Sequence, residues 1–518
     1  MTAAPQTDRH LGVARPLVIL SAGLFLFFLA WTAWIADDAY ITFRTIENWF
    51  NGFGPRWNVV ERVQTFTHPL WMLVLAAAFG VTREIYYTAL VVAMSVSLLS
   101  VGLFATRIAP TRFAAVFGLT CFTLSTSFVD FSTSGLENPL THLLLVAFLI
   151  VFWGEPTRPR RVLTLSALTA CMMMTRPDAT LLLLPALGIA AWRAGWRQSL
   201  PALAVGFLPI VAWEFSSLTY YGFPFPNSYY AKLSPGITQA ARTSQGYVYL
   251  VDAATRDPLT LLTIVVSLAL TCTRPGWRDW PIAAGMMIYL VAVVRIGGDF
   301  MAGRFLTAPL FCAVALLSRL PLVRDYRLAV PSLALVVLIG FPSAYRVLSA
   351  GSTFGESLDD VTTSSGISDE RRLYYQATGL RLAMNGRRIP SHPWAANGRE
   401  HRAKGTKVIV KATMGFRGFT AGPGVHVVDV LGVTDPLLAR LPPSSTEFHP
   451  GHIERAVPDG YVESLETGRN VIKDAGVAAY YEKLRVITQG PLWTSLRLRV
   501  IVNMNLGRYD YMLAALSK

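Results

Sequence analysis

Apolar runs about as long as a bilayer is thick recur through most of this 518-residue chain. A helix needs roughly 17–25 predominantly apolar residues to cross a bilayer, and about eleven such runs, some slightly short, can be delimited. The composition agrees, because 53% of the residues are hydrophobic, 15% are charged and the mean hydropathy is +0.41. We therefore predict an α-helical multi-pass membrane protein with about eleven transmembrane helices. The runs lie at 16–35, 85–105, 112–130, 137–153, 162–175, 179–193, 199–217, 257–272, 280–295, 305–318 and 328–342.

The chain after about residue 342 has a different character. It is polar and punctuated by Gly and Pro, and apolar residues alternate in Lys407–Ala412 and Val425–Leu431 as they do in strands. The segment Leu496–Met504 alternates in the same way and is also predicted to be a strand. We expect two domains, a transmembrane domain over 1–342 and a soluble mixed α/β domain outside the membrane over 343–518.

The excess of positive charge is explained by membrane topology. The formal net charge is +14, yet the arginines stand singly or in pairs between apolar runs, with no long basic tract, so nucleic-acid binding is not expected. Cytoplasmic loops of membrane proteins are rich in Lys and Arg. The alternation holds along the chain if His68–Gly80 is an interfacial helix. The predicted cytoplasmic arginines are Arg107, Arg112, Arg158, Arg160, Arg161, Arg193, Arg197, Arg274, Arg278, Arg319, Arg324 and Arg327.

Two adjacent carboxylates, Asp37 and Asp38, directly follow the first apolar run. Charges at the mouth of a membrane helix are costly and are commonly functional. One carboxylate can act as general base on an acceptor hydroxyl while the other orients it, as group transfer from a lipid-linked donor requires. The alternative is a helix N-cap, although a cap needs one Asp and two like charges repel. We predict that Asp37 and Asp38 are catalytic.

Several cations are predicted on the same outer face, against the usual charge bias. A departing lipid phosphate needs charge-assisted donors, which Arg supplies in pairs and Lys singly. The alternative is that Arg176 pairs with Asp178, and Arg304 with Asp299, as neutralised ion pairs at helix ends. The outer cations are Arg44, Arg62, Arg176, Lys232, Arg295 and Arg304; all except Arg295 are predicted to bind substrate.

Three further polar residues are candidates for substrate binding on this face. Glu137 precedes an apolar run and can either bind substrate or favour the helix dipole. Asp299 follows Gly297 and Gly298, whose backbone freedom permits a close approach of a ligand. His68, before Pro69, is either a helix start or a site residue.

No cofactor is fixed by the sequence. Cys121, Cys171, Cys272 and Cys312 lie far apart in apolar stretches without a CxxC pair, so neither a disulfide framework nor a zinc site is predicted. Two outward carboxylates could hold a divalent cation. The first apolar run lacks a small-residue cleavage site, so we expect it to be retained as a helix.

An ordered series of motifs resembles the bacterial terminal β-(1→2)-arabinofuranosyltransferases of mycobacterial cell-wall assembly, and a wider set of polyprenyl-phosphate-sugar transferases. The resemblance covers nearly the whole chain. The motifs are DDAYITFR, GPRWNVVERVQTFTHPLW, TSGLE, TRPDA, YYGFPFPNSYYAK, GGDFMAGRFLTAPLF, SSGISDERRLYYQATG and VVDVLGVTDPLLA.

The resemblance implies a GT-C-type membrane bundle and a catalytic acidic pair at Asp37 and Asp38. It implies an inverting glycosyltransferase of the bacterial inner membrane, with its site on the extracytoplasmic side. The implied donor is decaprenylphosphoryl-arabinose, and the implied acceptor is arabinogalactan or lipoarabinomannan. The resemblance also implies that a soluble module that binds carbohydrate follows the membrane region of the chain. The FPNSYY run is closer to the wider set, so another sugar, or an O-antigen or pilin acceptor, is the alternative. A lipid-linked sugar transporter is disfavoured, because no repeat is visible and the charges gather at one interface.

Overall fold

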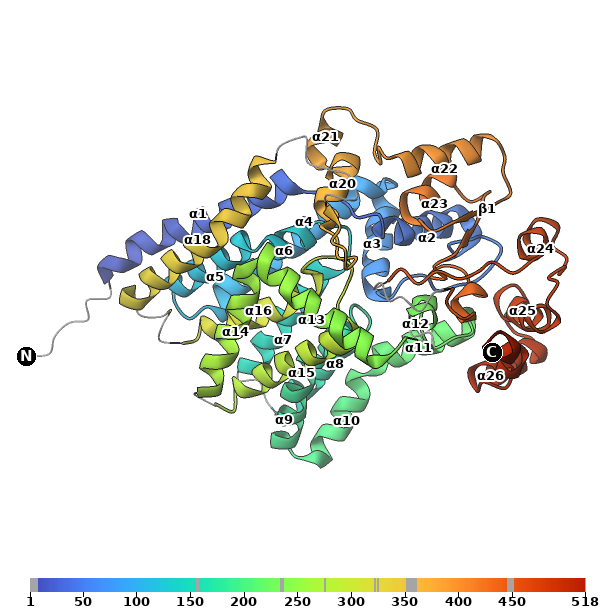
Figure 1. Ribbon diagram of the computed structural model, residues 1–518. Coiled ribbons are helices and arrows are strands. Elements are labelled where there is room, and N and C mark those ends of the chain that lie inside the picture. Colours follow the sequence, from blue (N-terminus) through green and yellow to red (C-terminus); the bar gives the residue numbers. More distant parts are fainter. Residues whose placement is uncertain are drawn as a thin grey trace, which may run out of the picture. The chain divides into compact units, whose positions relative to one another are not determined.

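The computed structural model describes residues 8–154, 158–232, 237–273, 276–320, 323, 326–350, 361–444 and 451–517, and these are mostly helical (Figure 1). Arg274 and Arg324, which we assigned to cytoplasmic loops, lie outside the described residues. The chain divides into two compact units, each assembled from three separate stretches. Unit 1 comprises 1–35, 89–209 and 243–387, and unit 2 comprises 36–88, 210–242 and 388–518.

Unit 1 is a bundle of apolar helices. Helix α5 packs against both α1 and α18, α14 packs against α16, and α8 packs against α7, α9 and α10. The helices are α1 (Asp8–Thr32), α4 (Ile85–Leu103, from Ala89 onward), α5 (Arg112–Leu124), α6 (Thr126–Phe131), α7 (Asn138–Trp153), α8 (Arg158–Met173), α9 (Leu184–Ala194), α10 (Trp196–Gly206), α13 (Gln239–Arg256, from Thr243 onward), α14 (Pro258–Thr273), α15 (Trp280–Ile296), α16 (Thr307–Leu317), α18 (Tyr326–Ser349), α20 (Glu370–Thr378) and α21 (Leu380–Met384).

Short polar residues fix where the helices of unit 1 begin and end. The Thr111 hydroxyl accepts a hydrogen bond from the amide of Ala114 and so caps α5. Ser125 ends α5 and caps α6 by accepting from the amide of Phe128. Helix α15 ends at Gly297, whose φ of 97° is a conformation that glycine adopts without strain. The loop that carries Asp299 and Arg304 starts at this turn.

Three helices are long and apolar enough to cross a membrane, which identifies a membrane protein: Arg15–Thr32, Ile85–Ile108 and Arg327–Ser349. Two bent pairs, Trp196–Gly206 with Leu208–Tyr220 and Gln239–Arg256 with Pro258–Thr273, would raise the number to five. Several other predicted runs form apolar helices of only 10–17 residues. The described residues thus support the predicted helical class, and the figure of about eleven spans stays a prediction.

Unit 2 combines helices with one small sheet among its described residues. Strands β1 (Val408–Lys411) and β2 (His426–Asp429) pair in parallel, with Val408 opposite His426 and Lys411 opposite Asp429. Helix α23 (Gly415–Ala421) makes the crossover between them, as a parallel pair requires. The other helices are α2 (Ala39–Asn48), α3 (Pro69–Thr82), α11 (Leu208–Tyr220, from Ile210 onward), α12 (Asn227–Lys232), α22 (Pro393–Ala403), α24 (Tyr461–Thr467), α25 (Ala475–Thr488) and α26 (Ser495–Asn505).

Two of the three predicted strands form, and the third was wrong. Leu496–Met504 belongs to helix α26, which Thr494 caps by accepting from the amide of Arg497. The buried residues of α26 are Arg497, Val500, Ile501 and Met504, a helical spacing of three, one and three. The alternation of Leu, Arg and Val is misleading because Arg497 is itself fully buried.

The predicted domain boundary at residue 342 does not coincide with the compact units. Residues up to 387 cluster with the helices of unit 1, while 36–88 and 210–242 cluster with the chain after 388. The segment 68–80, predicted to be an interfacial helix, does form helix α3.

Candidate active site

Asp37 is a buried carboxylate that anchors the start of α23 to the start of α2. One of its oxygens accepts the amide of Phe416 at 2.7 Å and the other accepts the amide of Gly415 at 3.2 Å. The first amides of a helix have no partner inside it, so they are available to such an acceptor. Gly415 is required here, because a Cβ at this position would clash with the backbone carbonyl of Asp37.

Asp38 occupies a different environment. It stands at the N-cap position of α2, but its side chain makes no capping hydrogen bond. It is half-buried, whereas Asp37 is only 7% exposed. The N-cap alternative is therefore not fulfilled for α2. Of the two acids, Asp38 is the one that a second molecule can reach.

Burial raises the pKa of Asp37 from its usual 3.8 to about 7. The amide of Phe416 opposes this shift, and the neighbouring charge of Asp38 adds to it. Asp37 thus titrates near neutrality while its two oxygens are held by backbone amides. Such an arrangement suits Asp37 to a role in positioning the neighbouring Asp38.

Two of the predicted binding arginines in unit 2 are occupied by backbone carbonyls. Arg44 is 2% exposed and donates to the carbonyls of Trp57 at 2.9 Å, Gly418 at 2.6 Å and Val425 at 2.8 Å. Arg62 donates to the carbonyls of Ile487, at 3.1 Å, and of Gly490. These bonds give both arginines a structural role, while the buried Nε of Arg62 has no hydrogen-bond acceptor among the described residues.

His68 and Lys232, the other two candidates of unit 2, differ from each other. The Nε2 of His68 lies 3.0 Å from the hydroxyl of Thr42 on α2, so the imidazole joins α3 to α2. Lys232 is the last residue of α12 and its side chain is exposed. Asn227 holds α12 in place by donating to the carbonyls of Gly432 at 2.8 Å and Asp435 at 2.9 Å. Lys232 is therefore an accessible cation on an anchored helix.

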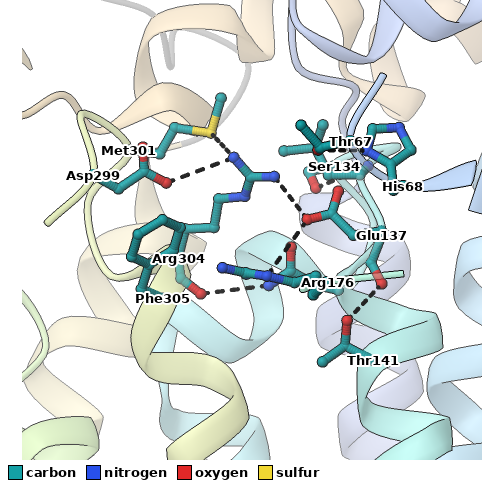
Figure 2. A network of polar contacts seen from close by, with 12 residues as sticks. Thr67, His68, Ser134, Glu137, Thr141, Arg176, Asp299, Met301, Arg304 and Phe305 are labelled. Carbon is teal, nitrogen blue, oxygen red and sulfur yellow. Dashed lines mark hydrogen bonds and ion pairs between the residues drawn. The ribbon is translucent and has the colours of Figure 1, made fainter. Parts of the chain in front are cut away.

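In unit 1 the remaining candidates converge on Glu137, as Figure 2 shows. Arg304 Nη2 lies 2.8 Å and Arg176 Nε 3.7 Å from the same Glu137 oxygen. Arg304 also reaches Asp299 at 3.6 Å, and Arg176 pairs with Asp178 at 2.6 Å. The sequence-based pairs Arg176–Asp178 and Arg304–Asp299 both form, and Glu137, predicted only as a separate candidate, joins them.

This cluster is held in place by tyrosines and glycines. Tyr289 donates to Asp178 at 3.1 Å, and the amide of Phe305 donates to the Tyr249 hydroxyl at 3.1 Å. Gly298 and Gly303 both have φ of 71°, and a Cβ at either would clash with Tyr249 or Ser127 respectively. The side chain of Arg304 is 14% exposed against 4% for Arg176, so Arg304 is the more accessible guanidinium.

The sequence analysis missed an acidic pocket that also belongs to unit 1. Asp130 pairs with Arg371 at 2.7 Å and Asp252 with Arg256 at 2.8 Å, and Ala302 and Gly303 complete the wall beside them. Its volume of about 30 Å³ admits a water molecule and no sugar. Asp130 could have been noticed as a carboxylate at the end of an apolar run.

A metal ion finds little support among the described residues. They contain no group of three or more His, Cys, Asp or Glu placed to hold one. Both oxygens of Asp37 already accept amides, so a divalent cation at Asp37–Asp38 would take most of its oxygen ligands from substrate and water.

Replacement of Asp37 tests its burial. The pKa of Asp37 in the folded protein, about 7, lies above its ordinary value of 3.8. Protonation of Asp37 therefore stabilises the folded state. This stabilisation is fully present below about pH 4 and is lost as the pH rises towards 7. We expect the melting temperature of the wild type, relative to D37N, to fall over this range and to level off above it. Thermal unfolding in detergent micelles from pH 4 to 8 measures this. A difference that does not change with pH contradicts the assignment.

Comparison with known proteins gives two curated relatives, and no protein-family model matches the chain. The chain is 28% identical over 496 residues to the terminal β-(1→2)-arabinofuranosyltransferase of Mycobacterium tuberculosis, covering 79% of this chain and 78% of the relative. It is 28% identical over 355 residues to the protein of the same name from Corynebacterium glutamicum, covering 59% of this chain and about half (51%) of the relative. These similarities confirm the resemblance that the ordered motifs predicted.

Among solved structures, the chain is similar to the crystal structure of ArnT from Cupriavidus metallidurans bound to undecaprenyl phosphate. The TM-score is 0.46 at 12% identity, over 80% of this chain and 86% of ArnT. This score is too low to establish a shared fold.

Proposed function

We propose that this protein is a membrane glycosyltransferase that transfers an arabinofuranosyl group from decaprenylphosphoryl-arabinose to a glycan of the cell envelope. The observation that carries the proposal is the similarity to two terminal β-(1→2)-arabinofuranosyltransferases. The product would be a terminal β-(1→2)-linked arabinose on arabinogalactan or lipoarabinomannan. The geometry of Asp37 and Asp38 agrees with this chemistry.

In the proposed reaction Asp38 acts as the general base. Its carboxylate takes the proton of an acceptor hydroxyl as that oxygen bonds to the anomeric carbon of the donor sugar. The bond from this carbon to the phosphate oxygen breaks, polyprenyl phosphate leaves with the electron pair, and the configuration inverts. Asp37, tied to the amides of Gly415 and Phe416, holds Asp38 in place and touches no substrate.

Positive charge is needed where the phosphate departs. Arg304 is the more accessible arginine of the Glu137 cluster, and Lys232 is exposed at the end of α12. We assign the donor-phosphate contact to one of these residues, Arg304 or Lys232. Arg176, bonded to Asp178 through two nitrogens at 2.6 and 3.2 Å, orients Glu137 and thereby Arg304.

The proposal extends to architecture and location. We propose a GT-C-type transmembrane bundle of about eleven spans in the bacterial inner membrane, with the site and the chain after residue 342 on the extracytoplasmic side. Transfer of a related polyprenyl-phosphate sugar to an O-antigen or a pilin is the alternative. It is kept open by the Phe-Pro-Asn-Ser-Tyr-Tyr run that ends at Tyr230.

Transfer by purified full-length protein tests the function. We expect arabinose from synthetic polyprenylphosphoryl-arabinose to appear on arabinan oligosaccharides, and less or none on pilin or O-antigen acceptors. D38N should slow this transfer by roughly 10²-fold or more, because it removes the base while keeping the side-chain size. It should melt close to the wild type, whereas D37N, which loses an amide acceptor, should melt lower.

Two results would contradict this function. Donor that crosses a vesicle membrane intact, without transfer to any acceptor, would favour a transporter. Near-normal turnover by both D37N and D38N would remove the acidic pair from catalysis.

Replacement of Arg304 or Lys232 by Gln tests the phosphate contact. The variant that loses the contact should lower turnover or weaken donor binding by roughly 10-fold or more and leave acceptor binding intact, since a charge-assisted bond to phosphate is lost. The assay is donor titration under initial-rate conditions. K404Q, which removes an exposed lysine of unit 2, is the control for K232Q.

R304Q also removes the nearer of the two arginines that contact Glu137, so its melting temperature is read beside that of E137Q/R304Q, in which that carboxylate is neutralised as well. If the double variant recovers both stability and activity, Arg304 serves only as an ion-pair partner. Wild-type donor affinity in R304Q and K232Q would exclude both residues from the site.

A further inference from the structure

A basic and aromatic pocket lies at one end of the helix bundle of unit 1. Helices α8 and α9 and the turn that precedes α15 form it, and α9 packs against both α8 and α15 (Figure 1). The cavity measures about 440 Å³, within the range of small-molecule binding sites. It is lined by Arg161, Ala190, Trp192, Arg193, Ala194 and Trp277.

Three guanidinium groups surround one indole in this pocket. Arg193 lies 4.0 Å from the centroid of the Trp277 ring, Arg278 lies 5.0 Å and Arg161 6.0 Å from it. Cation–π contacts hold the cations against the ring but do not neutralise them. Arg161 and Arg193 therefore keep their positive charge.

The described side chains that line the pocket include no carboxylate. The nearby Asp279 is paired with Arg319 at 3.0 Å. Arg161 donates to the carbonyl of Phe152, and its buried Nε has no hydrogen-bond acceptor among the described residues. Arg161 also lies in the first turn of α8, where the helix dipole disfavours a cation. An anion in the cavity would accept a hydrogen bond from this Nε and would offset the unfavourable interaction of Arg161 with the helix dipole.

The surroundings of the pocket are those of a membrane interface. Trp192 is 79% exposed and Trp196 67% exposed, and Arg197 lies 5.3 Å from the Trp196 ring centroid. Tryptophan is enriched at the level of lipid headgroups, and clusters of basic residues beside membrane helices bind anionic lipids. The apolar wall formed by Ala190 and Ala194 gives the acyl side of such a lipid a surface to lie on.

The pocket is separate from the Glu137 cluster. Arg161 lies in the first turn of α8 and Arg176 just beyond its last, and the helix between Arg161 and Met173 alone spans about 18 Å along its axis. Helix α15 repeats this arrangement, with Arg278 before its start and Asp299 after its end. This distance is more than half the thickness of a hydrocarbon core, roughly 30 Å.

We propose that this pocket binds the phosphate of an anionic phospholipid headgroup, with Arg161 and Arg193 as its ligands. The lipid neutralises the cations and fixes this end of the bundle at the membrane surface. The site does not depend on the transferase activity proposed above.

Thermal unfolding of the full-length protein in detergent micelles tests the proposal. Short-chain phosphatidylglycerol should raise the melting temperature saturably, and phosphatidylcholine of the same chain length should not. In R161Q/R193Q the apparent affinity for phosphatidylglycerol should fall by roughly 10-fold or more. R161K/R193K, which keeps the charge, should retain most of it. R107Q/R112Q removes two exposed arginines of unit 1 outside the pocket and should behave as the wild type.

A194F fills the pocket without changing its charge and should also weaken the lipid effect; it serves if R161Q/R193Q does not fold. Equal stabilisation by phosphatidylcholine, or an unchanged phosphatidylglycerol affinity in both R161Q/R193Q and A194F, overturns the proposal. Inorganic phosphate that gives the same saturable shift at the same concentration overturns the lipid as the source of the phosphate.

Discussion

The candidate site depends on the two hydrogen bonds that Asp37 accepts from the amides of Gly415 and Phe416. They join positions 378 and 379 residues apart in sequence, so the carboxylate fixes the start of α2 against α23. A buried carboxylate without such donors would cost several kcal/mol. Because both Asp37 oxygens accept these amides, the proposed reaction assigns the role of general base to Asp38.

Unit 2 is also held together by arginines that bind carbonyl oxygens. Arg44 joins α2 to the chain around α23 and β2, and Arg497 joins α26 to the carbonyls of Thr219 and Tyr220. Both are almost fully buried. An arginine used in this way looks, in sequence, the same as one that binds a phosphate. Arg44 and Arg62 were predicted as ligands for this reason.

Local patterns predicted much of the fold. The apolar runs become helices, the short alternations at Val408–Lys411 and His426–Asp429 become strands, and the 68–80 segment becomes α3. Leu496–Met504 was wrong because the prediction rested on alternation alone, which does not show that Arg497 is buried together with Val500 and Ile501. The division into units was out of reach, since it depends on contacts between stretches hundreds of residues apart.

For the site, the Arg176–Asp178 and Arg304–Asp299 pairs were accessible to sequence reasoning because the partners are two and five residues apart. Glu137 as their common partner was not, since it is 167 residues from Arg304. The same holds for Gly415, whose lack of a side chain lets Asp37 approach.

The most direct test of the account is a cryo-electron microscopy structure of the protein with a phosphonate analogue of the donor and an arabinan acceptor. The account predicts the acceptor hydroxyl within about 2.6–3.2 Å of the Asp38 carboxylate, with Asp37 still bonded to the amides of Gly415 and Phe416. An acceptor hydroxyl bonded to Asp37, or bound away from both acids, would contradict it.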